Sequence, residues 1–234
     1  MKIIAFDIGK KNFAFVMEEV DDEKLKKVTN IPKKERYDKD GTCTDKFKEE
    51  LQQVYLTGKI LMVENMDLTY ECDKKTYLDP KIYLNMITEM DRYKKQFDEC
   101  DVFLIERQMS FGKKKTNTMA LKLGQHCYSY LLMKYLNNKV IIDYPAYYKT
   151  QILGAPKKFG KITKTYKNGK TVEIQDNRKK WSVRISNDIL QLRNDDISLE
   201  IINDARKRDD MCDCLLMTIT FSYLYFVDKT KFSY

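Results

Sequence analysis

Three short apolar runs, each of strand length, open the chain. Residues 2–8 and 13–20 are separated by turn-forming positions that begin at Gly9, and residues 59–68 form the third run. Apolar residues in runs of this length, bounded by turn residues, are typical of buried strands. The pattern therefore predicts a hairpin followed by a third strand before any long helix.

The spacing of apolar residues then changes. Residues 82–97 and 116–137 carry apolar side chains at intervals close to 3.6, which predicts amphipathic helices. Each helix is followed by another short apolar run, at 102–107 and at 140–142. Three strands followed by two helix-strand passages predict an α/β fold with a mixed five-stranded sheet flanked by helices.

Two segments interrupt this order. Residues 21–57 are rich in charge and carry a helical pattern only at 45–56, so we interpret them as an insertion. A basic segment at 157–177 contains Asn168-Gly169 between alternating residues at 161–175, which predicts a β-hairpin. Two further helices are expected before the chain ends, at 179–192 and 209–226. We expect one domain over residues 1–234.

Positive charge is concentrated in one part of the chain. The net charge is +8, and the stretch 149–184 holds eleven Lys or Arg against only Glu173 and Asp176, which leaves the remainder close to neutral. A basic block beside a neutral body is typical of a polyanion-binding surface, because Lys and Arg displace counterions from phosphates. A solvated, flexible loop is the alternative interpretation.

Cysteine, histidine and hydropathy exclude other classes. The six cysteines form no Cys-x-x-Cys pair and the one histidine, His126, cannot complete a zinc pattern, so we expect reduced thiols and no zinc site. We recognise no signal peptide and no charge-free apolar run near eighteen residues. The expected protein is intracellular and not bound to membranes.

Four carboxylates are placed where they can converge. Asp7 and Glu106 each end a predicted strand, and Asp210 and Asp213 lie three apart on the last helix. A strand carries its final side chain to the rim of a sheet, and residues three apart share one helix face. Two structural alternatives are that Asp7 caps the next turn and that Arg208 or its neighbours pair with the helical aspartates.

Converging carboxylates without histidine are ligands for Mg²⁺, for which Mn²⁺ can substitute. Two such ions can activate water and stabilise the leaving oxygen in phosphodiester hydrolysis. Asp7, Glu106, Asp210 and Asp213 are therefore our predicted catalytic residues and metal ligands, and Asp209 is ambiguous.

The motifs around these residues resemble those of RuvC-like Holliday junction resolvases, in particular the type found in poxviruses and other large DNA viruses. The matching segments are Phe6-Asp7-Ile8-Gly9-Lys10-Lys11-Asn12, Glu106-Arg107-Gln108, Ala120-Leu121-Lys122-Leu123-Gly124-Gln125 and Asp209-Asp210-Met211-Cys212-Asp213. Each match is weak alone, and four in the same order are specific.

The resemblance implies a ribonuclease H-like fold, a homodimer, and Mg²⁺-dependent paired, symmetric nicking of four-way and other branched DNA. It covers the core strands and helices and leaves 21–57 and 157–177 without a counterpart. If the chain is viral, the expected place of action is the host cytoplasm at sites of viral DNA replication.

Nine lysines are candidate DNA contacts. Some precede the helix near Thr116, where a helix N-terminus with adjacent cations suits phosphate; others lie in the basic segment or match a basic run of the poxviral enzymes. They are Lys113, Lys114, Lys115, Lys122, Lys158, Lys161, Lys164, Lys179 and Lys180. Tyr144, Tyr147 and Tyr148 can stack on unpaired bases or pack in the core.

Three alternative functions remain open. Another nuclease of the same fold, such as a ribonuclease H or a transposase-like enzyme, would use the same metal chemistry. The Asp7-Ile8-Gly9 segment is also typical of sugar kinases and actin-type ATPases, but the second Asp-x-Gly strand pair of those folds is missing. A non-catalytic DNA-binding module would explain the basic hairpin but not the four carboxylates.

Overall fold

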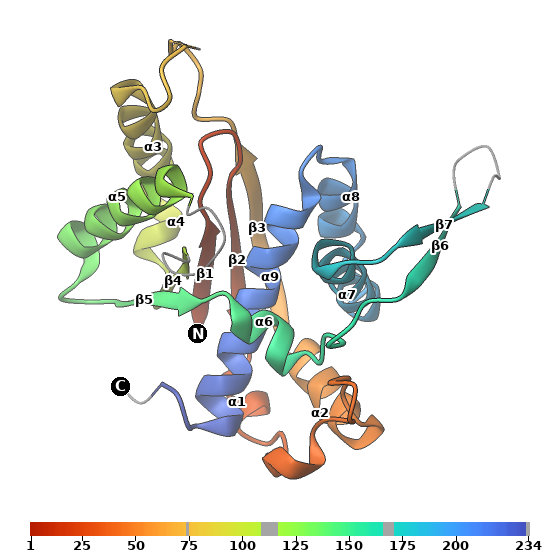
Figure 1. Cartoon of the computed structure of the whole chain (residues 1–234). Helices are drawn as coiled ribbons and strands as arrows, with labels where there is room; N and C mark the ends of the chain where they lie inside the picture. Colours follow the sequence, from red (N-terminus) through yellow and green to blue (C-terminus); the bar gives the residue numbers. More distant parts are fainter. Residues whose placement is uncertain (74, 109–116, 166–170, 233–234) are drawn as a thin grey trace.

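The fold is built on a five-stranded sheet in the order β3-β2-β1-β4-β5 (Figure 1). The first three strands are antiparallel neighbours, whereas β4 and β5 run parallel to β1. Their bounds are β1 Lys2–Asp7, β2 Phe13–Val20, β3 Gly58–Met66, β4 Val102–Arg107 and β5 Val140–Pro145. The predicted mixed sheet is confirmed. The structure, a computed structural model, describes residues 1–73, 75–108, 117–165 and 171–232.

The central strand β1 is covered on both faces, which explains its unbroken apolar sequence. Ile4 and Phe6 point into one apolar cluster, while Ile3 and Ala5 point into the other. All four side chains are fully buried. A strand with two buried faces has no need of polar residues until it reaches the rim of the sheet, where Asp7 lies.

One face of the sheet is covered by α3 (Pro80–Arg92), α4 (Lys94–Asp98) and α5 (Thr118–Tyr135) (Figure 1). Their apolar sides enclose a cluster of Phe rings that includes Phe6 and Phe15. The single helix predicted at 82–97 is in fact two, because the backbone leaves helical geometry at Tyr93 (φ −95°, ψ 13°).

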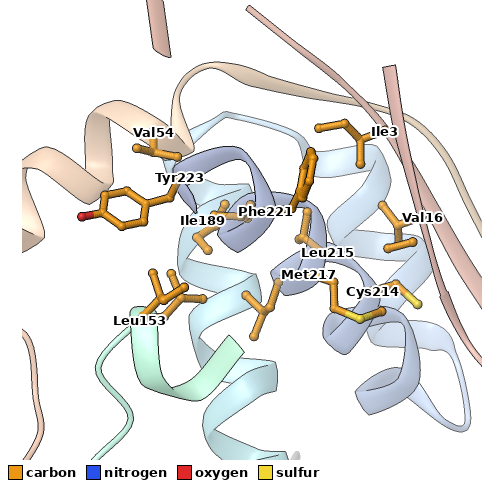
Figure 2. Packing of buried hydrophobic residues seen from close by; sticks show 14 of the residues in the cluster. Ile3, Val16, Val54, Leu153, Ile189, Cys214, Leu215, Met217, Phe221 and Tyr223 are labelled. Carbon is orange, nitrogen blue, oxygen red and sulfur yellow. The ribbon is translucent and has the colours of Figure 1, made fainter. Parts of the chain in front are cut away.

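Helix α9 (Arg208–Ser222) covers the other face and continues as a π-helical segment, Tyr223–Asp228. Helices α7 (Arg178–Leu192), α6 (Tyr147–Ile152) and α8 (Asp196–Asp204) pack around it, as Figures 1 and 2 show. Residues all round α9 are therefore buried. By length and composition Arg208–Asp228 could cross a membrane, but 83% of its most apolar window is buried inside the protein, which identifies it as a core helix.

The insertion at 21–57 is part of this core. It forms α1 (Asp22–Leu25), a 3₁₀ turn (Lys33–Glu35) and the expected helix α2 (Asp45–Tyr55). Its apolar side chains join the cluster around α9. The guanidinium of Arg36 pairs with Asp228 at 3.0 Å, and both side chains are buried. This ion pair anchors the insertion to the end of the π-helical segment.

The basic hairpin forms as expected and projects from the body beside α7 (Figure 1). Its strands are β6 (Lys161–Thr165) and β7 (Thr171–Gln175), and they form a sheet of their own. At its base the Asp176 amide donates to the Gly160 carbonyl at 2.9 Å. The predicted Asn168-Gly169 turn lies outside the described residues.

A fully buried ion pair crosses the core behind α9. Glu18 on β2 is 0% exposed and pairs with Arg193 at 2.5 Å. Thr218 of α9 donates to the other carboxylate oxygen. The pair connects β2, α9 and the end of α7. The register of the β2–β3 pairing shifts between Met17 and Glu18, next to this pair.

Candidate functional site

Two carboxylates emerge at the same rim of the sheet. Strands β1 and β4 pair in parallel up to Phe6 and Ile105, so Asp7 and Glu106 are the next residue on each strand. Side chains alternate along a strand. Asp7 follows the direction of Ala5, and Glu106 that of Leu104, into the face covered by α9.

Helix α9 brings the other two carboxylates to this rim. Asp210 lies in its first turn and Asp213 one turn later. Next to Asp213, the Cys214 thiol contacts the carbonyl of Ala14 at 3.5 Å, and Ala14 is the strand partner of Asp7. The first two turns of α9 therefore lie against the end of the hairpin that carries Asp7.

A buried lysine lies among these carboxylates. The Lys149 ammonium on α6 contacts Glu106 at 2.6 Å and Asp213 at 2.9 Å, and its side chain is only 5% exposed. Our sequence reasoning counted Lys149 only as part of a basic block. Its position shortly after the predicted strand at 140–142 was the one available indication, because Asp7 and Glu106 also lie at strand ends.

Negative charge at the site exceeds positive charge. Burial raises the pKa of Asp7 well above its usual value, the charge of Glu106 raises it further, and Lys149 opposes both. Burial and the neighbouring Asp209 raise the pKa of Asp210 to about 6. Burial alone would lower the pKa of Lys149, but Glu106 and Asp213 outweigh it and the pKa is raised. Lys149 therefore stays charged.

Asp209 has a cation of its own. Its carboxylate accepts a hydrogen bond from Lys179 at the start of α7, which lowers its pKa against the opposing effect of burial. Arg208 contacts the Asn203 side chain at 3.3 Å. Within the described part of the chain, Arg206 and Arg208 form no ion pair with the site aspartates, and Asp7 caps no turn.

The donor set suits a hard divalent cation. It consists of carboxylate oxygens only, and four carboxylates share one lysine. The raised pKa of Asp7 comes first from burial and then from the charge of Glu106. Among the described residues, no three acidic, His or Cys side chains form a ready metal cage. The Lys149 ammonium lies between Glu106 and Asp213 instead, so ion binding would require these side chains to turn.

Two of the resembling motifs meet on the opposite face of β4. Arg107 and Gln108 line a cavity of about 380 Å³ together with Gly124 and Gln125 of α5. Arg107 pairs with Asp143 of β5 at 2.6 Å. The sequence motifs that begin at Glu106 and Ala120 are therefore neighbours in space.

The nine candidate DNA-contact lysines have different surroundings. Lys122 on α5 and Lys158 before the hairpin are exposed. Lys161 is exposed on β6, and its ammonium lies 3.4 Å from the Glu173 carboxylate. Lys164 is also on β6, where it is the strand partner of Val172 on β7. Lys113, Lys114 and Lys115 lie outside the described residues.

The last two candidates belong to α7 and make intramolecular contacts. Lys179 pairs with Asp209, and Lys180 is half-buried and donates to the Gln175 carbonyl at the base of the hairpin. The three tyrosines that could stack on bases differ in exposure. Tyr144 is fully buried in the core, Tyr148 is half-buried, and Tyr147 is 48% exposed.

No protein-family model matches the chain. Uncharacterized protein 170L of Invertebrate iridescent virus 6 is 28% identical over 251 residues, covering 97% of this chain and 91% of the relative. Uncharacterized protein 97L of Invertebrate iridescent virus 3 is 29% identical over 223 residues, covering 92% and 96%. The chain therefore has full-length relatives encoded by two viruses.

Solved structures of resolvases are similar to this one. The Fowlpox virus resolvase in complex with its substrate Holliday junction DNA superposes with a TM-score of 0.49 at 18% identity, covering 96% of this chain and 99% of that chain. The yeast mitochondrial Holliday junction resolvase Ydc2 superposes with a TM-score of 0.52 at 13% identity, covering 94% and 77%. The chain shares the ribonuclease H-like fold of the RuvC-like resolvases, as its motifs predict.

Proposed function

We propose that the protein is a metal-dependent, structure-selective endonuclease that resolves four-way and other branched DNA by paired, symmetric nicks. The observation that carries this proposal is the meeting of Asp7, Glu106, Asp210 and Asp213 around the buried Lys149, on a fold shared with a Holliday junction resolvase. Four carboxylates that share one lysine at a sheet rim are costly for stability and need a further cation.

Asp7, Glu106, Asp210 and Asp213 would hold Mg²⁺, with Mn²⁺ as a substitute. When bound, two such ions supply an activated water and stabilise the leaving oxygen of a phosphodiester. Lys149 keeps Glu106 and Asp213 oriented toward the rim. Its charge also favours the negative charge that develops on the phosphate during cleavage, because buried cations act strongly in a water-poor site.

The exposed lysines of the hairpin supply a surface for the DNA arms. Lys158, just before the hairpin, and Lys161 on β6 are exposed. The hairpin lies beside α7, whose first turn contacts the start of α9 through Lys179 and Asp209 (Figure 1). Such cations bind phosphates without reading sequence, which suits an enzyme that recognises branch shape. Paired symmetric cuts require two active sites related by symmetry, and we therefore propose a homodimer. The viral relatives favour action in the host cytoplasm.

Cleavage of a labelled four-way junction tests the proposal against a linear duplex of the same sequence, with Mg²⁺ and with chelator. We expect paired nicks at symmetric positions in the junction alone, and only with Mg²⁺. Equal cutting of both DNAs, or of an RNA-DNA hybrid, would identify another nuclease of this fold. Binding without cutting would identify a DNA-binding module.

Asp213→Asn is the matched variant for this assay. It keeps the shape of the side chain and its hydrogen-bonding capacity toward Lys149 while removing one negative charge. We expect junction binding to persist and cleavage to be lost. Retained cleavage would remove Asp213 from the catalytic set.

A further inference from the structure

A groove of about 700 Å³ lies beside α6, the helix that carries Lys149. Its walls come from the insertion, from α6, from the segment before the hairpin and from the end of the chain. Neither the insertion nor the hairpin segment belongs to the motifs that resemble other enzymes. The groove is therefore a feature of this chain's own additions to the fold.

Helix α6 borders both the groove and the candidate active site. Its residues Tyr148, Thr150, Gln151 and Ile152 line the groove. Lys149 of the same helix reaches Glu106 instead. A ligand in the groove is thus one helix away from the carboxylates.

The groove is positively charged. Its lining includes five cationic side chains and two carboxylates, and one of these carboxylates, Asp228, is already paired with Arg36. Lys33, Arg178 and Lys231 are exposed, and no ion pair engages them within the described ranges. Cations that converge on a concavity without partners favour a polyanionic ligand.

Aromatic rings lie among these cations. Tyr37, Tyr148 and Phe159 line the groove and are each partly buried. Tyr37 is fixed by a hydrogen bond to the Ile152 carbonyl at 3.3 Å, and Tyr148 packs edge-on against Tyr144. Fixed rings beside exposed cations are the combination with which proteins bind unpaired nucleic acid, through base stacking and phosphate contacts.

We propose that this groove binds an unpaired stretch of DNA strand next to the branch point, and so holds a strand that passes the active site. The inference rests on the proposed function for the identity of the DNA. The volume is that of a small-molecule site and too small for a duplex, which favours a single strand. The walls are already anchored through Arg36 and Asp228, so the groove needs no folding step to form.

The test is binding of a fluorescein-labelled single strand of deoxythymidines, measured by fluorescence anisotropy in chelator so that catalysis plays no part. The variant is Lys33→Gln with Arg178→Gln, because both side chains are exposed and neither packs in the core. For loss of two phosphate contacts we expect the slope of log affinity against log salt to fall by about 1.4, which is roughly a 25-fold weaker affinity at 0.1 M salt.

The matched control is Lys59→Gln with Lys95→Gln, which removes the same charge from exposed positions on β3 and α4, away from the groove. We expect its single-strand affinity to stay within about twofold of the wild type. Thermal unfolding of both double variants should match the wild type. Equal losses in the two variants, or no loss in either, would overturn the proposal.

A linear duplex separates strand binding from general DNA binding. The groove variant should bind duplex as the control does, and an equal loss for duplex and single strand would mean that the groove contacts duplex arms instead. Junction cleavage by the wild type is recorded in parallel. If the wild type does not cleave junctions but its strand binding depends on the groove, only the proposed function is refuted. If it cleaves junctions and its strand binding does not depend on the groove, only this inference is refuted.

Discussion

Removing the positive charge of Lys149 should destabilise the metal-free protein. Lys149→Met keeps an unbranched side chain that is one atom shorter, but it leaves Glu106 and Asp213 without the ammonium that lies 2.6 and 2.9 Å from them. These carboxylates then face Asp7, whose pKa is already raised by burial and by Glu106. The folded state must either hold several unpaired negative charges close together or take up protons.

The structure sets the size of the effect. Removing one partner of a buried ion pair costs about 3–5 kcal/mol. The lower end applies here, about 3 kcal/mol, because Lys149 and Glu106 are 5% and 14% exposed but Asp213 is 27% exposed and keeps some contact with water. For a chain of this length that corresponds to a melting temperature lower by about 6–12 °C.

The assay is thermal and urea unfolding in chelator and again in Mg²⁺. A divalent ion bound by the carboxylates supplies the missing positive charge, so the difference between variant and wild type should narrow in Mg²⁺. The control is Lys161→Met, which breaks an exposed pair with Glu173 and should change stability by less than about 0.5 kcal/mol. If Lys149→Met is as stable as Lys161→Met in chelator, the carboxylates are not in electrostatic conflict and the reasoning fails.

Three further predictions rest on separate parts of the molecule. Asp7→Asn should stabilise the metal-free protein, and more at pH 8 than at pH 5. A carboxyl whose pKa is raised in the folded state costs stability as the pH climbs from the ordinary pKa toward the raised one. Urea unfolding at both pH values measures this gain, and an equal gain at both would contradict the prediction. Arg193→Met should cost about 3 kcal/mol by leaving the fully buried Glu18 unpaired, and adding Glu18→Gln should recover part of that loss, also in urea unfolding. Residues 161–175 can be replaced by a short Gly-Ser turn between Gly160 and Asp176. This change should weaken junction binding and reduce its salt dependence, but leave the cleavage rate at saturating DNA unchanged. A lower cleavage rate at saturating DNA would place the hairpin in catalysis.

Strands β1, β2 and β4 could be predicted because they are buried on both faces. Unbroken apolar runs such as 102–107 can be accommodated in few other ways, and the structure confirms all five strands with small shifts at their ends. Asp7 and Glu106 were identifiable for the same reason, since a charged residue that ends an apolar run is expected at a rim of the sheet. Local sequence was sufficient to predict an element wherever that element was long and its surroundings were uniform.

The insertion shows where local sequence was insufficient. Leu25, Ile31 and Phe47 are isolated apolar residues among charges, and alone they indicate a solvated segment. Each is buried against the α9 cluster, and the ion pair of Arg36 with Asp228 closes the contact across 192 residues of sequence. Only the tertiary partner reveals the role of Leu25 and Ile31, because neither has a periodic pattern around it, whereas Phe47 lies in the helical pattern at 45–56.

Short helices escaped prediction for a related reason. Helix α6 has six residues, too few to show a period, and α8 follows α7 so closely that their patterns merge. The failure to predict α6 mattered most, because this helix carries Lys149. A helix this short is positioned by its packing against α9 rather than by its own propensity.

The basic block illustrates what charge density can and cannot say about function. Within one stretch of sequence, Lys149 points inward to carboxylates, Lys180 closes the base of the hairpin, and Lys161 faces solvent. These side chains have the same charge and three different roles, because what distinguishes them is the partner that the fold brings near. A count of cations therefore predicts the class of ligand, a polyanion, whereas the contacts determine which lysines remain free to bind it. On this basis we propose that the exposed lysines of the hairpin and the cations of the groove bind DNA, whereas Lys149 belongs to the carboxylate site.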